Sequence, residues 1–83
     1  MSVYTEAIRS DRGNSHDYFG RGAAYFDLKQ YNKAVDAYSE AIRLDSKYVD
    51  AYESRGKAYE AIGEVEKAKA DFKTAKQLGF RRN

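Results

Sequence analysis

The sequence predicts an all-α fold, an antiparallel solenoid of helix hairpins, because one pattern of residues is written twice. The second copy follows the first after thirty-four positions. The residues Tyr18, Arg21, Gly22, Ala24, Tyr25, Lys33, Ala34, Ala41 and Leu44 recur as Tyr52, Arg55, Gly56, Ala58, Tyr59, Lys67, Ala68, Ala75 and Leu78. A fixed period of this size is typical of stacked repeats. Within each copy the apolar residues follow the spacing of one helical face.

Composition supports a small folded domain. The chain has 83 residues, of which 34% are charged and 42% hydrophobic, a balance typical of folded rather than disordered proteins. No apolar run approaches the roughly 20 residues that span a bilayer. The absence of cysteine excludes disulfides and thiolate metal sites, and with no signal peptide it favours an intracellular, cytoplasmic protein. A net charge of +2 is too small to imply nucleic acid.

The two copies carry a recognisable motif. Each has the order Tyr-x-x-Arg-Gly-x-x-Tyr, followed by Ala-x-x-x-Tyr or Ala-x-x-x-Phe. This motif resembles the tetratricopeptide repeat, a helix–turn–helix unit of 34 residues. The resemblance divides the chain into two units, 15–48 and 49–83. It implies a scaffold for protein–protein interaction, without catalytic activity.

The first fourteen residues resemble half of a further unit. Residues 4–11 read YTEAIRSD, and residues 38–45 read YSEAIRLD. We therefore predict an orphan helix, the second helix of an incomplete repeat, followed by a turn at residues 12–15. A helix this short needs a partner to be stable. Either the chain is a piece of a longer array, or Tyr4, Ala7 and Ile8 mediate self-association with another copy.

Two helices are expected in the first unit, over about residues 16–28 and 32–44. Gly22 should let its helix approach the second helix at Ala34, and Leu28 should point inward. Arg21 stands where the family usually has a large apolar residue. We expect its stem to cover the core while its guanidinium reaches water or a carboxylate.

The connections differ between the units. Lys29 stands where unit two has Gly63, so a positive φ there would cost about 1 kcal/mol. Ser46 stands where the family usually has proline, and it can cap the next helix. Lys69 and Lys76 replace apolar residues of unit one, as a solvent-facing end of an array requires.

A binding groove is predicted on the opposite face of the first helix of each unit, which in the family holds an extended or helical peptide. Phe19 and Phe26 lie on this face with no predicted internal partner, and exposed aromatic residues mark interaction sites. Cover by a missing helix is the alternative. The predicted groove residues are His16, Phe19, Ala23, Phe26, Asp27, Asp50, Glu53, Ser54, Lys57 and Glu60.

The charges of this groove suggest a ligand. Asp50, Glu53 and Glu60 form an acidic end, which favours a peptide with an apolar or aromatic anchor followed by lysine or arginine. One subclass of the family binds acidic chaperone tails through lysine, asparagine and arginine. Phe19, Ala23 and Ser54 occupy those places here, so the sequence argues against chaperone tails.

Other functions are less well supported. A basic stripe could meet RNA or an acidic partner, but a solvated end of the array explains it equally well. This stripe consists of Lys69, Lys73, Lys76, Arg81 and Arg82. His16 is the only histidine and makes neither a metal site nor a catalytic triad. We therefore predict no enzyme, metal or cofactor, and no nucleic-acid partner.

Overall fold

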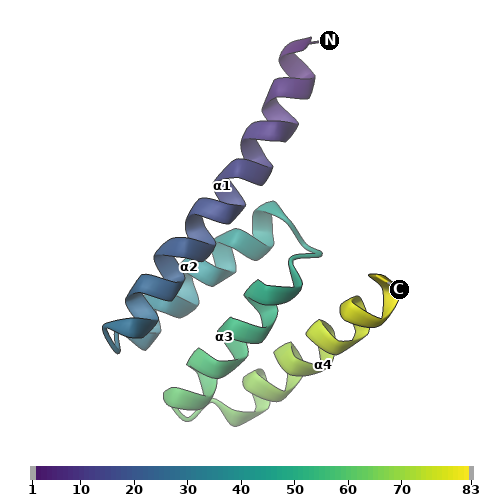
Figure 1. The fold of residues 1–83 in the computed structure, drawn as a ribbon. Coiled ribbons are helices and arrows are strands. Elements are labelled where there is room, and N and C mark those ends of the chain that lie inside the picture. Colours follow the sequence, from purple (N-terminus) through teal and green to yellow (C-terminus); the bar gives the residue numbers. More distant parts are fainter. Residues whose placement is uncertain (1, 83) are drawn as a thin grey trace.

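A computed structural model shows four α-helices between residues 2 and 82, each antiparallel to the one before it (Figure 1). They are α1 (Ser2–Asp27), α2 (Tyr31–Leu44), α3 (Val49–Ala61) and α4 (Val65–Arg82). The structure describes the backbone of residues 2–82 and the side chains of residues 14–79. Helix α1 packs against α2 and α3 against α4, while α2 and α3 join the two pairs. The predicted all-α arrangement of helix hairpins is confirmed.

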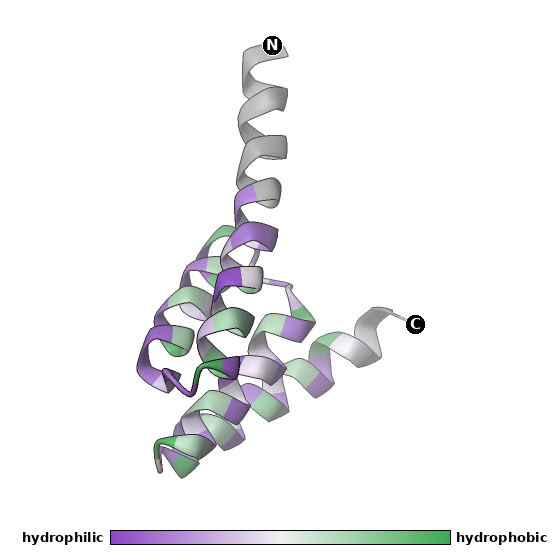
Figure 2. Cartoon of the chain, turned by 60° about the vertical axis from the view of Figure 1, so that its left-hand side comes forward, coloured by the Kyte–Doolittle hydropathy of each residue, from purple (hydrophilic) through white to green (hydrophobic). Residues whose placement is uncertain are grey.

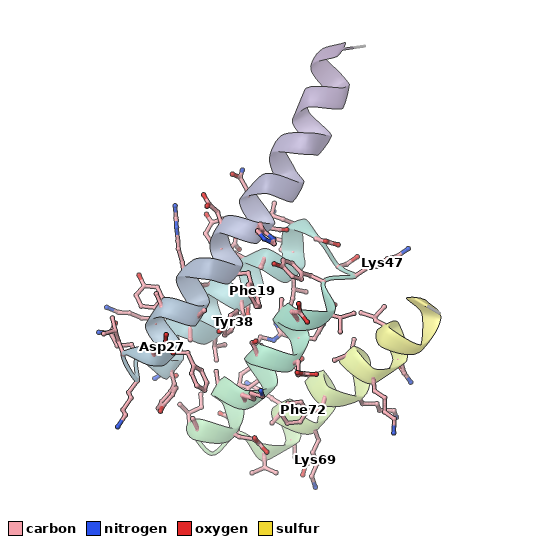
Figure 3. The ribbon with its side chains drawn as sticks, in the orientation of Figure 1. Phe19, Asp27, Tyr38, Lys47, Lys69 and Phe72 are labelled. Carbon is pink, nitrogen blue, oxygen red and sulfur yellow. The ribbon has the colours of Figure 1, made fainter. Side chains whose placement is uncertain are left out.

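Small residues bring the helices of each hairpin together. In the described parts of the helices, hydrophobic and hydrophilic residues are interspersed, as burial of one side requires (Figure 2). A Cβ added at Gly22 would lie 2.6 Å from the ring of Tyr38, and one at Gly56 would lie 2.6 Å from the ring of Phe72. Both rings belong to the second helix of their hairpin (Figure 3). The close approach predicted at Gly22 is confirmed, but its main contact is Tyr38 rather than Ala34.

The turn predicted at residues 12–15 is wrong. Helix α1 is continuous from Ser2 to Asp27, and Gly13 and Ser15 lie within it. The physical reason is that a single glycine costs a helix only about 1 kcal/mol, and no proline interrupts this stretch. The side chains of Tyr4, Ala7 and Ile8 lie outside the described residues. Their role in self-association stays a prediction.

The two hairpin turns have the same hydrogen bonds. In the first, the Lys29 amide donates to the Phe26 carbonyl and the Gln30 amide to the Tyr25 carbonyl; unit two repeats this pair thirty-four residues later. This is the Schellman arrangement, which needs a left-handed residue after the helix. Lys29 has φ 62° and Gly63 has φ 83°, so Lys29 does adopt the positive φ whose cost the sequence raised as a question. Leu28, beside it, is 66% exposed, so its predicted inward position is wrong.

The strain at Lys29 makes a matched pair of predictions. Replacing Lys29 with glycine should raise the free energy of unfolding by about 0.5–1 kcal/mol, because glycine adopts positive φ without a Cβ clash. Replacing Gly63 with lysine should lower it by about 1 kcal/mol. Urea denaturation of the two variants and the parent chain checks both signs. A less stable Lys29→Gly variant would contradict the account.

The two hairpins are joined by a tight turn from Asp45 to Tyr48. The Tyr48 amide donates to the Asp45 carbonyl, and the Lys47 amide donates to Asp45 Oδ1, each at 3.1 Å. Helix α3 begins at Val49 with Tyr48 in the capping position and no side-chain cap. The prediction that Ser46 caps this helix is therefore wrong. Its carbonyl instead accepts a hydrogen bond from the Tyr52 hydroxyl at 3.0 Å.

One buried ion pair ties three helices together. Arg55 of α3 makes two parallel hydrogen bonds to Asp71 of α4, at 2.7 and 2.8 Å, and a third to Ser39 of α2 at 3.1 Å. The hydrogen bonds to Asp71 raise the pKa of the Arg55 guanidinium above its usual value. In unit one Arg21 is exposed and lies 5.2 Å from the centre of the Tyr18 ring. The exposed Arg21 guanidinium agrees with the prediction that it reaches the surface.

The outer face of α4 is polar. Lys69, labelled in Figure 3, and Lys76 are both exposed, and the predicted exposure of these two lysines is confirmed. In the described part of the chain, no helix combines the length and the apolar character that crossing a membrane would require.

Candidate functional site

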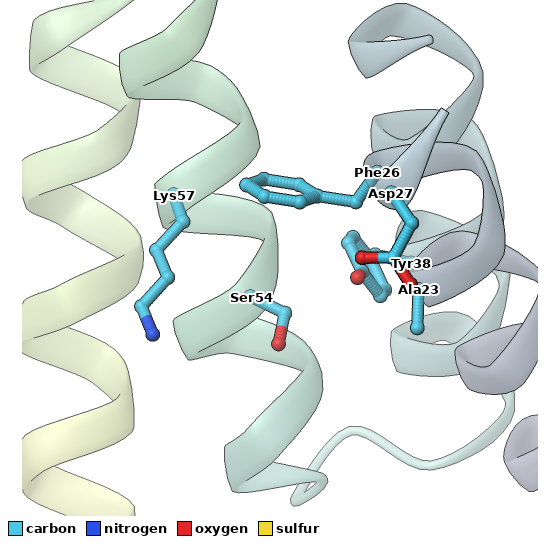
Figure 4. Close-up of a pocket in the computed structure, with 6 residues that line it drawn as sticks. All are labelled: Ala23, Phe26, Asp27, Tyr38, Ser54 and Lys57. Atoms are coloured by element: carbon cyan, nitrogen blue, oxygen red, sulfur yellow. The ribbon is translucent and has the colours of Figure 1, made fainter. Parts of the chain in front are cut away.

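A cavity of about 190 Å³ opens between α1 and α3, with α2 forming its floor (Figure 4). Its walls come from the first helix of each hairpin, which stand side by side because α2 returns the chain between them. The residues that line it are Ala23, Phe26 and Asp27 of α1, Tyr38 of α2, and Ser54 and Lys57 of α3. We refer to this site as the groove pocket.

The groove pocket contains half of the predicted groove residues. Ala23, Phe26, Asp27, Ser54 and Lys57 were expected on this face, and the structure brings them to one cavity. Tyr38 was missed, because its helical position placed it in the core. It is indeed only 2% exposed. The signal that could have found it is its hydroxyl group, which a purely apolar core position does not need.

The two phenylalanines are not free, so the prediction that they lack internal partners is wrong. The Phe19 ring lies 5.6 Å from the Tyr38 ring and 5.1 Å from the Tyr48 ring. The Phe26 ring meets the Tyr31 ring edge-on at 5.2 Å. Both are half-buried, because tyrosines from α2 and from the turn before α3 reach the same face. Of the two, only Phe26 presents surface to the groove pocket.

The remaining predicted residues lie outside the groove pocket. His16 stacks on Tyr48 with ring centres 6.0 Å apart, and its Nδ1 lies 2.9 Å from the Tyr48 hydroxyl oxygen. Burial, and then the charges of nearby aspartates, raise the pKa of Tyr48. Asp50, Glu53 and Glu60 are exposed on α3 but do not line the cavity.

Hydrogen bonding and charge give the groove pocket its chemistry. Burial raises the pKa of the Tyr38 phenol, the hydrogen bond with Ser54 offsets part of this rise, and the charge of Asp27 adds to it. The phenol is therefore neutral and able to donate a hydrogen bond. Lys57 supplies a cation from one wall and Asp27 an anion from the other (Figure 4). Such a site can orient a charged peptide beside the apolar ring of Phe26.

Among the residues whose side chains the structure describes, no three histidine, aspartate or glutamate side chains come together as a metal site would need. The groove pocket itself holds one carboxylate and no histidine. Its chemistry is that of noncovalent recognition by hydrogen bonds, one charge of each sign, and an aromatic surface.

Comparison with known proteins identifies the family. A family model described as TPR repeat matches residues 22–63, and one described as tetratricopeptide repeat matches residues 49–78. The chain belongs to the tetratricopeptide repeat family, whose members are scaffolds for protein–protein interaction and typically non-catalytic. A search of curated proteins gave no match.

A similar solved structure shows a ligand of one such domain. It is the second TPR of Spaghetti (RPAP3) bound to the HSP90 peptide SRMEEVD. The two chains are 34% identical and superpose with a TM-score of 0.78. The match covers 93% of this chain and 71% of that one.

This comparison corrects the predicted partner. The sequence argued against acidic chaperone tails and for a peptide with lysine or arginine, but the similar domain binds an acidic tail. The prediction weighed Asp50, Glu53 and Glu60 as one acidic end of the groove. None of these three carboxylates lines the groove pocket, where Lys57 faces the cavity instead.

Proposed function

We propose that this chain is a peptide-binding module that takes an acidic carboxy-terminal segment of a partner protein in the groove pocket. The observation that carries the proposal is the position of Lys57, a cation beside Phe26 on the face between the two hairpins. The similar domain bound to an HSP90 tail supports this class of ligand. The module acts as a scaffold, with recognition rather than catalysis as its role.

Each wall of the groove pocket has a part in this recognition. Lys57 pairs with a carboxylate of the peptide, and the exposed edge of Phe26 contacts an apolar side chain such as methionine or valine. Asp27 repels the acidic end and so orients the peptide with its carboxylates toward α3. The contact area of two repeats is small, so we expect micromolar affinity, roughly −8 kcal/mol.

The test is calorimetric titration with the peptide SRMEEVD. Replacing Lys57 with glutamine should weaken binding about five-fold, or ~1 kcal/mol, because the charge-assisted hydrogen bond is lost. Replacing Asp27 with asparagine should strengthen binding by a similar factor, because the opposing charge is removed. Both effects should shrink at high salt.

Two controls make this titration decisive. Lys69→Gln removes an exposed lysine of α4 that does not line the groove pocket, and it should leave the affinity unchanged. The peptide SRMQQVN with an amidated end lacks the carboxylates and should bind more weakly. Equal binding of the two peptides, or no effect of Lys57→Gln, would overturn the proposal.

A further inference from the structure

In the part of α1 whose side chains the structure describes, one side of the helix has no neighbouring helix, whereas the same side of α3 is covered. In the second hairpin, Arg55 stacks near Tyr52 and Tyr59 and donates to Ser39 of α2 and Asp71 of α4. Helix α3 therefore lies between two neighbours, whereas α1 packs closely on α2 alone (Figure 1). The equivalent residues of α1 are Tyr18, Arg21 and Tyr25, which we call the open face.

The open face combines aromatic rings with exposed charged groups. Arg21 is exposed and stacks on Tyr18, and the exposed Lys33 of α2 lies 5.8 Å from the centre of the Tyr25 ring. Where Asp71 serves the second hairpin, the first has Ala37. The open face thus combines half-buried aromatic rings with Arg21 and Lys33, and the exposed Asp17 and Asp36 lie within one helical turn of these two cations. Its aromatic rings would suit the apolar side of an amphipathic helix.

The chain itself contains such a helix sequence. Residues 4–11, YTEAIRSD, resemble residues 38–45, YSEAIRLD. Residues 38–44 form the second half of α2, and α2 covers the equivalent face of α3. Because α1 is continuous from Ser2 to Asp27, this segment cannot fold back on its own open face.

We propose that the open face binds residues 4–11 of a second copy of this chain, so that two α1 helices pair antiparallel. Such a pairing is two-fold symmetric and covers both open faces at once. It is independent of the groove pocket, which lies on the other side of α1. A dimer formed in this way leaves that site free on each copy.

The register follows from the internal repeat. The contact between Ser39 and Arg55, shifted back by thirty-four positions, brings position 5 of one copy beside Arg21 of the other. The two-fold axis then passes near Gly13. The spacing of residues along α1 gives the same register to within one position. Residues on one side of the helix are separated alternately by three and four positions, the spacing found in paired helices. These residues are Tyr4, Ala7, Asp11, Asn14, Tyr18, Arg21 and Tyr25.

Cysteine cross-linking tests this register in a chain that has no cysteine of its own. Tyr4→Cys and Arg21→Cys are made as separate variants and mixed in equal amounts under mild oxidation. We expect the disulfide between the two different variants to form in several-fold excess over both homodimers, because position 4 faces position 21 only across the axis. Disulfides in the random ratio of one to two to one would overturn the proposal.

Sedimentation of the unmodified chain is the second test of the proposed dimer. We expect a reversible dimer at micromolar to millimolar concentration, and a single 9.5 kDa species throughout that range would overturn the proposal. Gly13→Pro breaks α1 near the axis and lets residues 4–11 fold back within one chain. It should weaken the dimer at least ten-fold with helical content retained, whereas Gly20→Ala, on an open surface, should not. A Gly13→Pro variant as dimeric as the parent would also contradict the proposal.

Discussion

Replacing Asp71 with asparagine is expected to lower the free energy of unfolding by about 3 kcal/mol. The Asp71 side chain is 7% exposed and accepts two hydrogen bonds from Arg55, which is itself 20% exposed. Asparagine keeps the shape but removes the charge, and its amide nitrogen would face a guanidinium that only donates. A largely buried cation without its counter-charge is strongly destabilising. Urea denaturation measures the loss.

Two variants show whether the ion pair is responsible. Glu40→Gln removes the exposed pair between Glu40 and Arg43, whose side chains are 40% and 65% exposed, and should have no measurable effect. Replacing Arg55 with methionine together with Asp71→Ala removes both charges at once. This double variant should recover most of the stability, because no buried charge is left unpaired. If Asp71→Asn were as stable as Glu40→Gln, the ion pair would not be the link between the helices.

Adding one methyl group at Gly22 or Gly56 is expected to cost up to about 2 kcal/mol. The new Cβ would lie 2.6 Å from the ring of Tyr38 or Phe72, closer than atoms of this kind approach. Overpacking of this kind costs roughly 1–3 kcal/mol, and the better helix propensity of alanine returns about 1 kcal/mol of it. Thermal and urea denaturation of Gly22→Ala and Gly56→Ala test this.

Gly20 provides the matched control for these substitutions. It lies in the same helix as Gly22, and a Cβ added there would meet nothing within 4 Å. Gly20→Ala should therefore stabilise the chain by about 0.5–1 kcal/mol through helix propensity alone. Equal effects at Gly20 and Gly22 would show that the rings move aside without cost. A Phe72→Leu substitution should partly rescue Gly56→Ala, since it removes the clashing ring atoms.

The fold could be predicted because several features of one repeat unit recur at the same positions in the other. The same spacing of Gly22 and Gly56, and the matching turns at Lys29 and Gly63, define two hairpins in similar geometry. At residues 12–15 the sequence could not distinguish a turn from a continuous helix, because a single glycine is compatible with both. The repeat pattern showed that residues 4–11 resemble the second helix of a unit. It did not show that they continue directly into the first helix of the next unit.

The candidate site was predicted only in part, for a similar reason. Helical spacing correctly put Phe26 and Lys57 on facing helices, but it could not show which side chains would meet at one cavity. The prediction placed Asp50 and Lys57 in the same groove because they share a helical face, although only Lys57 lines the groove pocket. The ligand class was then judged from summed charge. A peptide responds to the few groups it touches, which is why that prediction was wrong.

Mapping of backbone amide shifts with the peptide SRMEEVD tests the central claim most directly. Spectra of the labelled chain are recorded during the titration, and again with the amidated peptide SRMQQVN, which lacks the carboxylates. We expect the largest shifts around the groove pocket, at Ala23, Phe26, Asp27, Ser54 and Lys57, with saturation in the micromolar range. Shifts confined to Lys69, Lys73 and Lys76 of α4, or no shifts at millimolar peptide, would contradict the account.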